Sequence, residues 1–328
     1  MPIIQVENLT KEFKIKKRKP GIMGAISSLV KTEYITKTAV NGISFEIEKG
    51  ETVGYIGMNG AGKSTTIKML VGILNPTSGS VRVNQIEPYK ERKENAKKIG
   101  VVFGQRTQLW WDLPVQESFK LIAGIYKVSE SQFKKNMEVL NDILNIDKFI
   151  DTPTRQLSLG QRMRADICAA FLHNPEIVYL DEPTIGLDVI AKRQIQNFIS
   201  EINKKYNTTI ILTTHDMSDI EKICKRVIII DEGEILFDGA LENLKNAYEL
   251  SNELIIETDE SDIDPSRFKN EKTESIKVVD NKLCIQFKGS VKPIQIVEEL
   301  MKECKIIDFQ LKENRLEDLI HKIYSGKA

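Results

Sequence analysis

The sequence has no apolar run long enough to cross a bilayer. A membrane-spanning helix needs about 18 or more consecutive apolar residues, and no stretch of this chain reaches that length. The N-terminus also lacks the apolar core of a secretory signal peptide. We therefore expect the protein to work from the cytoplasmic side, so that any membrane role would depend on partner proteins.

Cysteine is scarce, and neither sign of charge is in excess. The four cysteines lie far apart, without a CxxC pair or histidines at metal-ligand spacing, so reduced thiols are expected. Lys and Arg together number 47, as do Asp and Glu, which leaves no overall field to attract nucleic acid. The 328 residues allow one large domain and a small one.

Short apolar runs alternate with helical patterns through the first 240 residues. The segments 115–128 and 130–146 have helical patterns, and Ser129 with Gln132 three positions later predicts a capping box for the second. Strands alternating with helices favour an α/β sheet with a mostly helical insertion at about 105–170. Strands are predicted at 3–9, 43–47, 52–56, 99–103, 177–181, 209–214, 227–231 and 234–237.

Two segments depart from this pattern. Residues 14–37 begin with a basic cluster and continue with apolar residues at helical spacing from Ile22 to Val30, which indicates an insertion. After Gly239 a short helix, a strand near 254–258 and a helix near 316–323 predict a small α+β domain. We therefore divide the chain into 1–240, with the insertion 14–37, and 241–328.

A phosphate-binding loop follows the strand at 52–56. Residues 57–64 read GMNGAGKS and match GxxxxGK[ST] in full, and a helix is predicted over 64–74. Glycines allow backbone N–H groups to surround phosphate oxygens at a positive helix end. Lys63 is expected to reach the β- and γ-phosphates, Ser64 to ligate Mg²⁺ and Thr65 to contact the α-phosphate. The predicted ATP-binding residues of the loop are Gly57, Asn59, Gly60, Ala61, Gly62, Lys63, Ser64 and Thr65.

A second apolar strand ends in two carboxylates. The run Ile177–Asp181 has the form of a Walker B strand, followed by Glu182. A buried parallel strand delivers Asp181 at its carboxyl end, where it can hold Mg²⁺. Because Glu182 is one residue further on, it points differently, toward the γ-phosphate.

The segment Leu157-Ser158-Leu159-Gly160-Gln161 lies about twenty residues before the Walker B carboxylates. Together with the phosphate loop it resembles the LSGGQ signature of ATP-binding cassette (ABC) ATPases, with Leu159 in place of the first glycine. The resemblance implies an α/β P-loop NTPase cassette. This fold has a RecA-like core, an antiparallel β subdomain and a helical subdomain, here followed by a small C-terminal α+β accessory domain.

The resemblance also implies a second cassette as partner. Ser158, Gly160 and Gln161 would then complete the ATP site of the opposite subunit, and Asp188 in the D-loop would lie across the dimer interface. An isolated chain would bind ATP but turn it over poorly.

Four further roles follow from the resemblance. Glu182 would be the general base, His215 the switch histidine that contacts the γ-phosphate, and Gln105 the Q-loop residue that contacts Mg²⁺ and the attacking water. Phe13 would stack on adenine, with Tyr34 as an alternative, since a structural phenylalanine would look the same. ATP and Mg²⁺ are therefore the expected substrate and cofactor.

The region 105–114, with Trp110 and Trp111, resembles that of bacterial ABC-2-type exporter ATPases, and the C-terminal segment resembles the accessory domain of drug-resistance-type exporters. This implies an ATPase that energises export through separately encoded membrane permeases at the cytoplasmic face of the membrane. Trp110 and Trp111 would be either permease-facing or local core. The basic insertion 14–37 would meet the permease or lipid headgroups, or be a solvated loop.

Two other functions stay open at this point. An ABC importer ATPase would carry the same motifs. A soluble ABC ATPase acting on the ribosome or DNA is less favoured, because such relatives carry two cassettes or long coiled coils and this sequence has neither. No nucleic-acid partner is expected.

Overall fold

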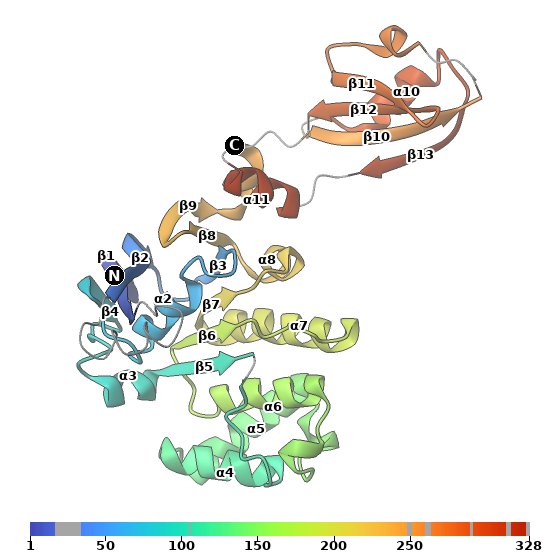
Figure 1. The fold of residues 1–328 in the computed structure, drawn as a ribbon. Helices are drawn as coiled ribbons and strands as arrows, with labels where there is room; N and C mark the ends of the chain where they lie inside the picture. Colours follow the sequence, from blue (N-terminus) through green and yellow to red (C-terminus); the bar gives the residue numbers. More distant parts are fainter. Residues whose placement is uncertain are drawn as a thin grey trace, which may run out of the picture. The chain divides into compact units, whose positions relative to one another are not determined.

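In the computed structural model the chain forms two compact units, Met1–Ala240 and Leu241–Ala328 (Figure 1). The structure describes residues 1–16, 34–104, 106–247, 251–259, 264–288, 291–312 and 316–325. Each unit has its own hydrophobic core. No helix within these ranges is both long and apolar enough to cross a membrane.

A six-stranded sheet forms the centre of the first unit (Figure 1). The strand order is β5-β6-β7-β3-β8-β9, and every neighbouring pair is parallel except β8 with β9. Strands β3, β6 and β7 are buried almost throughout, as expected for parallel strands covered on both faces. The strands are β3 (Thr52–Gly57), β5 (Ile99–Phe103), β6 (Ile177–Asp181), β7 (Thr209–Thr213), β8 (Arg226–Asp231) and β9 (Glu234–Ala240).

A smaller antiparallel sheet has the order β2-β1-β4, formed by β1 (Ile4–Lys16), β2 (Tyr34–Ile47) and β4 (Ser78–Val83). The β1–β2 hairpin extends into both ends of the segment predicted as an insertion, 14–37, as far as the pair Lys16–Tyr34. β-Branched and aromatic residues such as Ile15 and Tyr34 favour this extension. The helical pattern from Ile22 to Val30 lies outside the described residues.

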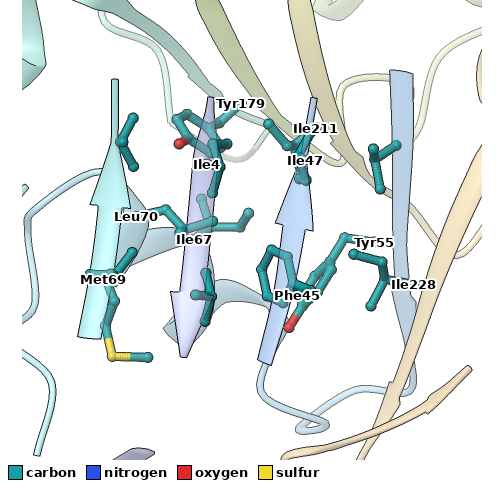
Figure 2. Close-up of a cluster of buried hydrophobic side chains, with 14 of the residues drawn as sticks. Ile4, Phe45, Ile47, Tyr55, Ile67, Met69, Leu70, Tyr179, Ile211 and Ile228 are labelled. Atoms are coloured by element: carbon teal, nitrogen blue, oxygen red, sulfur yellow. The ribbon is translucent and has the colours of Figure 1, made fainter. Parts of the chain in front are cut away.

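A hydrophobic cluster joins the two sheets to helix α2 (Lys63–Leu70). Figure 2 shows side chains of the small sheet, the large sheet and this helix meeting in the cluster. The rings of Phe45 and Tyr55 lie 6.0 Å apart between centroids. Each large buried side chain stabilises the fold by about 1.5–3 kcal/mol. The cluster therefore holds α2 in place, and with it the phosphate loop that leads into this helix.

A group of helices lies between β5 and β6 in the sequence (Figure 1). Helix α6 packs against β5, and α4 and α5 pack against α6. Helix α5 ends at Leu144 because Asn145 adopts a left-handed conformation. Its predicted capping box is half formed: Ser129 caps the helix, but the Gln132 side chain donates to Asn136. The elements are α4 (Val115–Ile125), α5 (Glu130–Leu144), η1 (Ile146–Lys148), η2 (Thr154–Gln156) and α6 (Leu159–Phe171).

Three more helices lie in the described part of the first unit: α3 (Arg92–Lys98), α7 (Val189–Tyr206) and α8 (Met217–Ile223). Helix α7 is amphipathic and buries Ile195, Phe198, Ile199 and Ile202. Phe198 meets Phe171 of α6 edge to face, with ring centroids 5.2 Å apart. This contact packs the middle of α7 against the end of α6.

The second unit contains an antiparallel sheet with the order β11-β12-β10-β13. Helix α10 packs on one sheet face through Ile296, Val297 and Leu300, against a buried cluster that includes Leu254 and Phe287. The unit is thus an α+β fold. Its elements are α9 (Leu241–Ala247), β10 (Ser251–Thr258), η3 (Pro265–Phe268), β11 (Thr273–Val279), β12 (Lys282–Lys288), α10 (Pro293–Leu300), β13 (Ile306–Lys312) and α11 (Leu316–Tyr324).

Candidate functional site

The phosphate loop connects the end of β3 to the start of α2. Gly60 and Gly62 have φ values of 91° and 109°, in the left-handed region that favours glycine. At Gly62 a Cβ atom would lie 2.5 Å from the Ala39 carbonyl oxygen, so a larger residue would displace the loop from β2. Ala61 is buried beneath the loop, while Asn59 and Ser64 are exposed and Thr65 is half-buried.

Lys63 lies inside this loop. Its Nζ atom donates to the carbonyl oxygens of Gly57 at 2.6 Å and Met58 at 3.2 Å, and only 7% of the residue is exposed. Burial lowers the pKa of Lys63, and the nearby carboxylates of Glu182 and Asp181 oppose that shift. The ammonium group and the two Walker B carboxylates therefore share one electrostatic environment.

The two carboxylates lie at the carboxyl end of β6, beside the end of the neighbouring parallel strand β7. Asp181 pairs in register with Thr213, whose hydroxyl donates to Asp181 Oδ1 at 2.5 Å. Glu182 has a φ of 53°, which is uncommon outside glycine, and its N–H donates to the Thr213 carbonyl at 2.9 Å. This turn sends the Glu182 side chain in a different direction from Asp181.

His215 lies beside Glu182. The distance from His215 Nδ1 to Glu182 Oε1 is 3.3 Å; the His215 side chain is 62% exposed and that of Glu182 20%. Both residues line a cavity of about 290 Å³, together with residues 184–187 and with Val189, Lys192, Thr214 and Asp216. A mostly solvated histidine and a more shielded carboxylate thus face the same space.

Gln105 lies outside the described residues, but Gly104 immediately before it is described. The Gly104 N–H donates to the Asp181 carbonyl at 2.7 Å. A Cβ atom at Gly104 would lie 2.3 Å from the Glu182 carbonyl oxygen. Only glycine therefore allows the chain leaving β5 to pass this close to the two carboxylates.

Ser158, Gly160 and Gln161 form the start of α6. The Gln161 N–H donates to Ser158 Oγ at 3.2 Å, and the Ser158 N–H donates to Gln161 Oε1 at 2.9 Å, which completes a capping box. Sequence reasoning missed this box, although its S-x-x-Q spacing is the one noted at Ser129. Ser158 is exposed. In the described part of the chain no hydrogen bond joins these three residues to Lys63 or Glu182.

The start of α6 lies beside the start of α7. A Cβ atom at Gly160 would lie 3.0 Å from Ala191 Cβ, and one at Gly186 would lie 3.2 Å from Leu159 Cδ2. Asp188 caps α7, since its Oδ1 accepts from the N–H groups of Ile190 at 2.9 Å and Ala191 at 2.8 Å. The signature and the D-loop of one chain are therefore in contact.

Comparison with known proteins identifies the family. The sequence model of the ABC transporter family matches residues 40–185. The ABC transporter ATP-binding protein NatA of Bacillus subtilis (strain 168) is 34% identical over 206 residues, 63% of this chain and 83% of NatA. The chain belongs to the ABC transporter ATP-binding family. It is an ATP-hydrolysing subunit of an ABC transporter, as the sequence analysis predicted.

Two further relatives are similar to this cassette. The linearmycin resistance ATP-binding protein LnrL of Bacillus subtilis (strain 168) is 34% identical over 215 residues, 66% of this chain and 68% of LnrL. The methionine import ATP-binding protein MetN 3 of Shouchella clausii (strain KSM-K16) is 35% identical over 219 residues, 65% of this chain and 64% of MetN 3.

Among solved structures, the dimeric ATP-binding cassette MJ0796 bound to ADP and Pi is similar to this chain. The alignment covers 73% of this chain and 98% of the MJ0796 chain. The TM-score is 0.59 and the sequence identity 26%. The predicted fold class, an α/β P-loop cassette of the ABC type, is confirmed.

The aromatic candidates for adenine stacking lie at different distances from the cassette's phosphate loop. Ala39 of β2 touches the loop. Phe13 pairs with Lys37, which lies two residues before Ala39 on β2, whereas Tyr34 is itself five residues before Ala39 on that strand. At about 3.3 Å per strand residue these separations are roughly 7 and 16 Å. Phe13 is 36% exposed, with the Lys11 ammonium 5.3 Å from its ring centroid. The strand register therefore favours Phe13 over Tyr34.

Gly104 and Thr213 are cassette residues that the sequence analysis did not single out. The sequence signal for Thr213 was its position at the end of a strand just before His215. Which residue of the neighbouring strand it would meet depends on the sheet register, since only the pairing of β6 with β7 sets Thr213 opposite Asp181.

Proposed function

We propose that the phosphate loop and the Walker B carboxylates form a Mg²⁺-dependent ATP hydrolysis site. The observation that carries the proposal is Lys63. Its buried ammonium group donates to the carbonyls of its own loop and lies close to Asp181 and Glu182. ATP phosphates would take over these donor groups, with the loop N–H groups and the N-terminus of α2 supplying further positive potential.

The oxygen donors beside the loop suit Mg²⁺. Ser64 supplies an exposed hydroxyl and Asp181 a carboxylate, with Gln105 as a further candidate by resemblance. Mg²⁺ prefers such oxygen ligands and takes others from nucleotide phosphates, where it neutralises developing charge. Thr213, by donating to Asp181, would fix the orientation of that carboxylate.

Glu182 is the proposed general base and His215 its neighbour on the γ-phosphate side. The Glu182 carboxylate accepts a proton from the attacking water, and His215 contacts the phosphoryl group that is released. Their 3.3 Å contact supports a shared task in one cavity. Proton transfer of this kind contributes about 10²–10⁴-fold to a rate.

The test is to replace Glu182 by Gln. We expect kcat for ATP hydrolysis to fall by about 100-fold or more, because the amide cannot accept the proton, while ATP affinity stays within about threefold. Steady-state ATPase assays and titration with a fluorescent ATP analogue measure the two quantities.

Glu176→Gln is the matched control, since Glu176 precedes the same strand at its other end and its side chain is 43% exposed beside Lys49. Full activity is expected for this variant. A Glu182→Gln protein that hydrolyses ATP at the wild-type rate would rule out Glu182 as the base.

We further propose that the complete site contains two chains. Ser158 is exposed at a helix N-terminus and, within the part of the chain that the structure describes, makes no hydrogen bond to its own phosphate loop, so a γ-phosphate held by a second cassette is the partner that fits it. Gly160 and Gln161 would complete this contact and Asp188 would lie across the interface. The dimer of MJ0796 supports this arrangement.

The cassette is proposed to energise export at the cytoplasmic face of a membrane, through separately encoded permeases. The resistance named for LnrL supports export, whereas the import named for MetN 3 favours the alternative, an importer ATPase. Neighbouring genes for six-helix ABC-2-type permeases would support export; a gene for a lipoprotein-like binding protein would support import.

A further inference from the structure

A buried carboxylate lies next to the proposed hydrolysis site. Asp219, in the first turn of α8, is fully buried. Its oxygens accept from the Thr184 hydroxyl, from the Thr214 hydroxyl at 3.3 Å and from Gln196 Nε2 at 2.6 Å. A buried charge is retained only when it is both hydrogen-bonded and paired with an opposite charge. The Asp219 carboxylate therefore needs a cation in addition to these three donors.

Lys192, one turn into α7, supplies the cation. Its Nζ atom lies 3.6 Å from Asp219 Oδ1, forms an ion pair with Asp216 and donates to Ser218 Oγ at 2.8 Å. The Lys192 side chain is only 19% exposed, so solvent screens these contacts less than it would on an open surface. One ammonium group thus holds two carboxylates of the following loop and helix.

This network joins the three segments that carry the proposed catalytic and interface groups. Thr184 follows Glu182 by two residues, Thr214 and Asp216 flank His215, and α7 begins directly after Asp188. Lys192 and Asp216 line the same cavity as Glu182 and His215. Lys192 and Asp216 are therefore close to the proposed reacting region.

We propose that Asp219 and Lys192 are positioning residues that hold His215 and Glu182 in register and tie both to the D-loop helix α7. The inference rests on the proposed hydrolysis site. The Lys192–Asp216 ion pair links α7 directly to the loop of His215, so a shift of the first turn of α7 moves that loop with it. Contact between Asp188 and a second cassette would in this way set the geometry of the hydrolysis site.

The test compares Lys192→Met with Lys192→Arg and Asp216→Asn in the full chain. Methionine keeps the apolar stem and removes the charge; arginine restores it; asparagine still caps α8 but weakens the ion pair. For Lys192→Met and Asp216→Asn we expect kcat to fall about tenfold or more, with KM and ATP-analogue affinity within about threefold. Arginine should restore most of the activity.

A second measurement does not depend on hydrolysis. Hydrogen exchange of residues 182–188 and 213–219 should become faster in Lys192→Met, while residues 57–63 keep the wild-type rate. The control is Lys222→Met, which removes an ammonium bonded to Gln196 at 3.1 Å but leaves the link to Asp216 intact. It should keep the wild-type kcat and exchange.

Wild-type exchange in both segments of Lys192→Met would overturn the inference, whatever the ATPase assay gives. So would an equal loss of kcat, ATP affinity and thermal midpoint in Lys192→Met and Lys222→Met, since that pattern marks a merely structural role. The Glu182→Gln assay tests the hydrolysis site separately, so failure of the two ideas can be told apart.

Discussion

At the scale of single residues, the site depends on where buried charges find partners. Lys63 is held by loop carbonyls, Asp181 by Thr213 and Glu182 by His215. Asp166 is a further case, on α6. It accepts from the Thr107 hydroxyl and the Gln108 N–H, both at 2.9 Å, and so ties the segment after Gln105 to the signature helix. Burial raises the pKa of Asp166 to about 6, against the effect of these hydrogen bonds.

This raised pKa predicts an unusual pH dependence of stability. Between pH 4 and 6 the native chain keeps a proton on Asp166 that the unfolded chain releases, so the free energy of unfolding falls as pH rises through this window. Asp166→Asn keeps both acceptor contacts without a charge. Between pH 4 and pH 7 the free energy of unfolding of the wild type should therefore fall by up to roughly 3 kcal/mol relative to that of Asp166→Asn. Urea unfolding at each pH measures both values.

The comparison with the variant is needed because His173 acts in the opposite direction. Burial lowers the pKa of His173 to about 4, so its contribution to stability is lost as pH falls below about 6.5. A constant difference between wild type and Asp166→Asn over the whole range would contradict the assignment to Asp166.

At the scale of elements, the signature is a helix start that serves two purposes. Its capping box satisfies the N–H groups of Ser158 and Gln161, and the same helix end is proposed to face the partner's γ-phosphate. Leu159 departs from the LSGGQ pattern, yet it is 39% exposed and packs beside Gly186 rather than displacing Gly160. The contact surface of Gly160 with Ala191 is thereby kept.

Ser158→Asp separates the two purposes. Aspartate is as good an N-cap as serine, so α6 should stay folded, but its negative charge would repel the γ-phosphate. We expect ATPase activity to fall about 100-fold, ATP binding by the single chain to stay within about threefold, and the ATP-dependent dimer to disappear from size-exclusion chromatography.

The matched control is Ser129→Asp at the start of α5, where Ser129 caps a helix in the same way. That variant should behave as wild type. If Ser158→Asp hydrolyses ATP normally, the composite site is wrong.

At the scale of the whole molecule, the first unit carries all the proposed site residues that the structure describes, and the second has a separate core. The first unit also bears Trp110 and Trp111, which are 41% and 51% exposed and so are not simply local core. The Arg162 guanidinium lies 5.6 Å from the Trp111 ring, a contact that stabilises by only about 0.5–1 kcal/mol. Exposed tryptophans of this kind are frequent anchors of protein interfaces.

Replacing both tryptophans by alanine should weaken assembly with the membrane partner. We expect the amount of cassette that copurifies with a coexpressed permease to fall at least about fivefold, because aromatic anchors carry much of the energy of an interface. ATP-analogue binding should not change.

Tyr206→Ala is the control, since Tyr206 is 49% exposed at the other end of the sheet, at the end of α7. Unchanged copurification of the double tryptophan variant would exclude this surface as the permease contact.

Much of the fold was predictable because its signals are local. The strands Ile99–Phe103 and Ile177–Asp181 have the predicted bounds, since short apolar runs between polar turns leave few alternatives. The β1–β2 hairpin was predicted less well, because charged residues such as Lys14 and Lys16 conceal a strand that is stabilised by pairing across 17 or more intervening residues. Helix ends at Asn145 and Asn207 depended on left-handed caps.

The sequence by itself determined the chemistry of this protein, because phosphate binding needs glycines, a lysine and a helix start in immediate succession, and that spacing is local. Tertiary structure alone decided which groups meet. The Thr213–Asp181 bond, the Glu182–His215 contact and the ions around Lys192 and Asp219 join segments up to 35 residues apart. Such contacts follow from sheet register and helix packing, which no local pattern specifies.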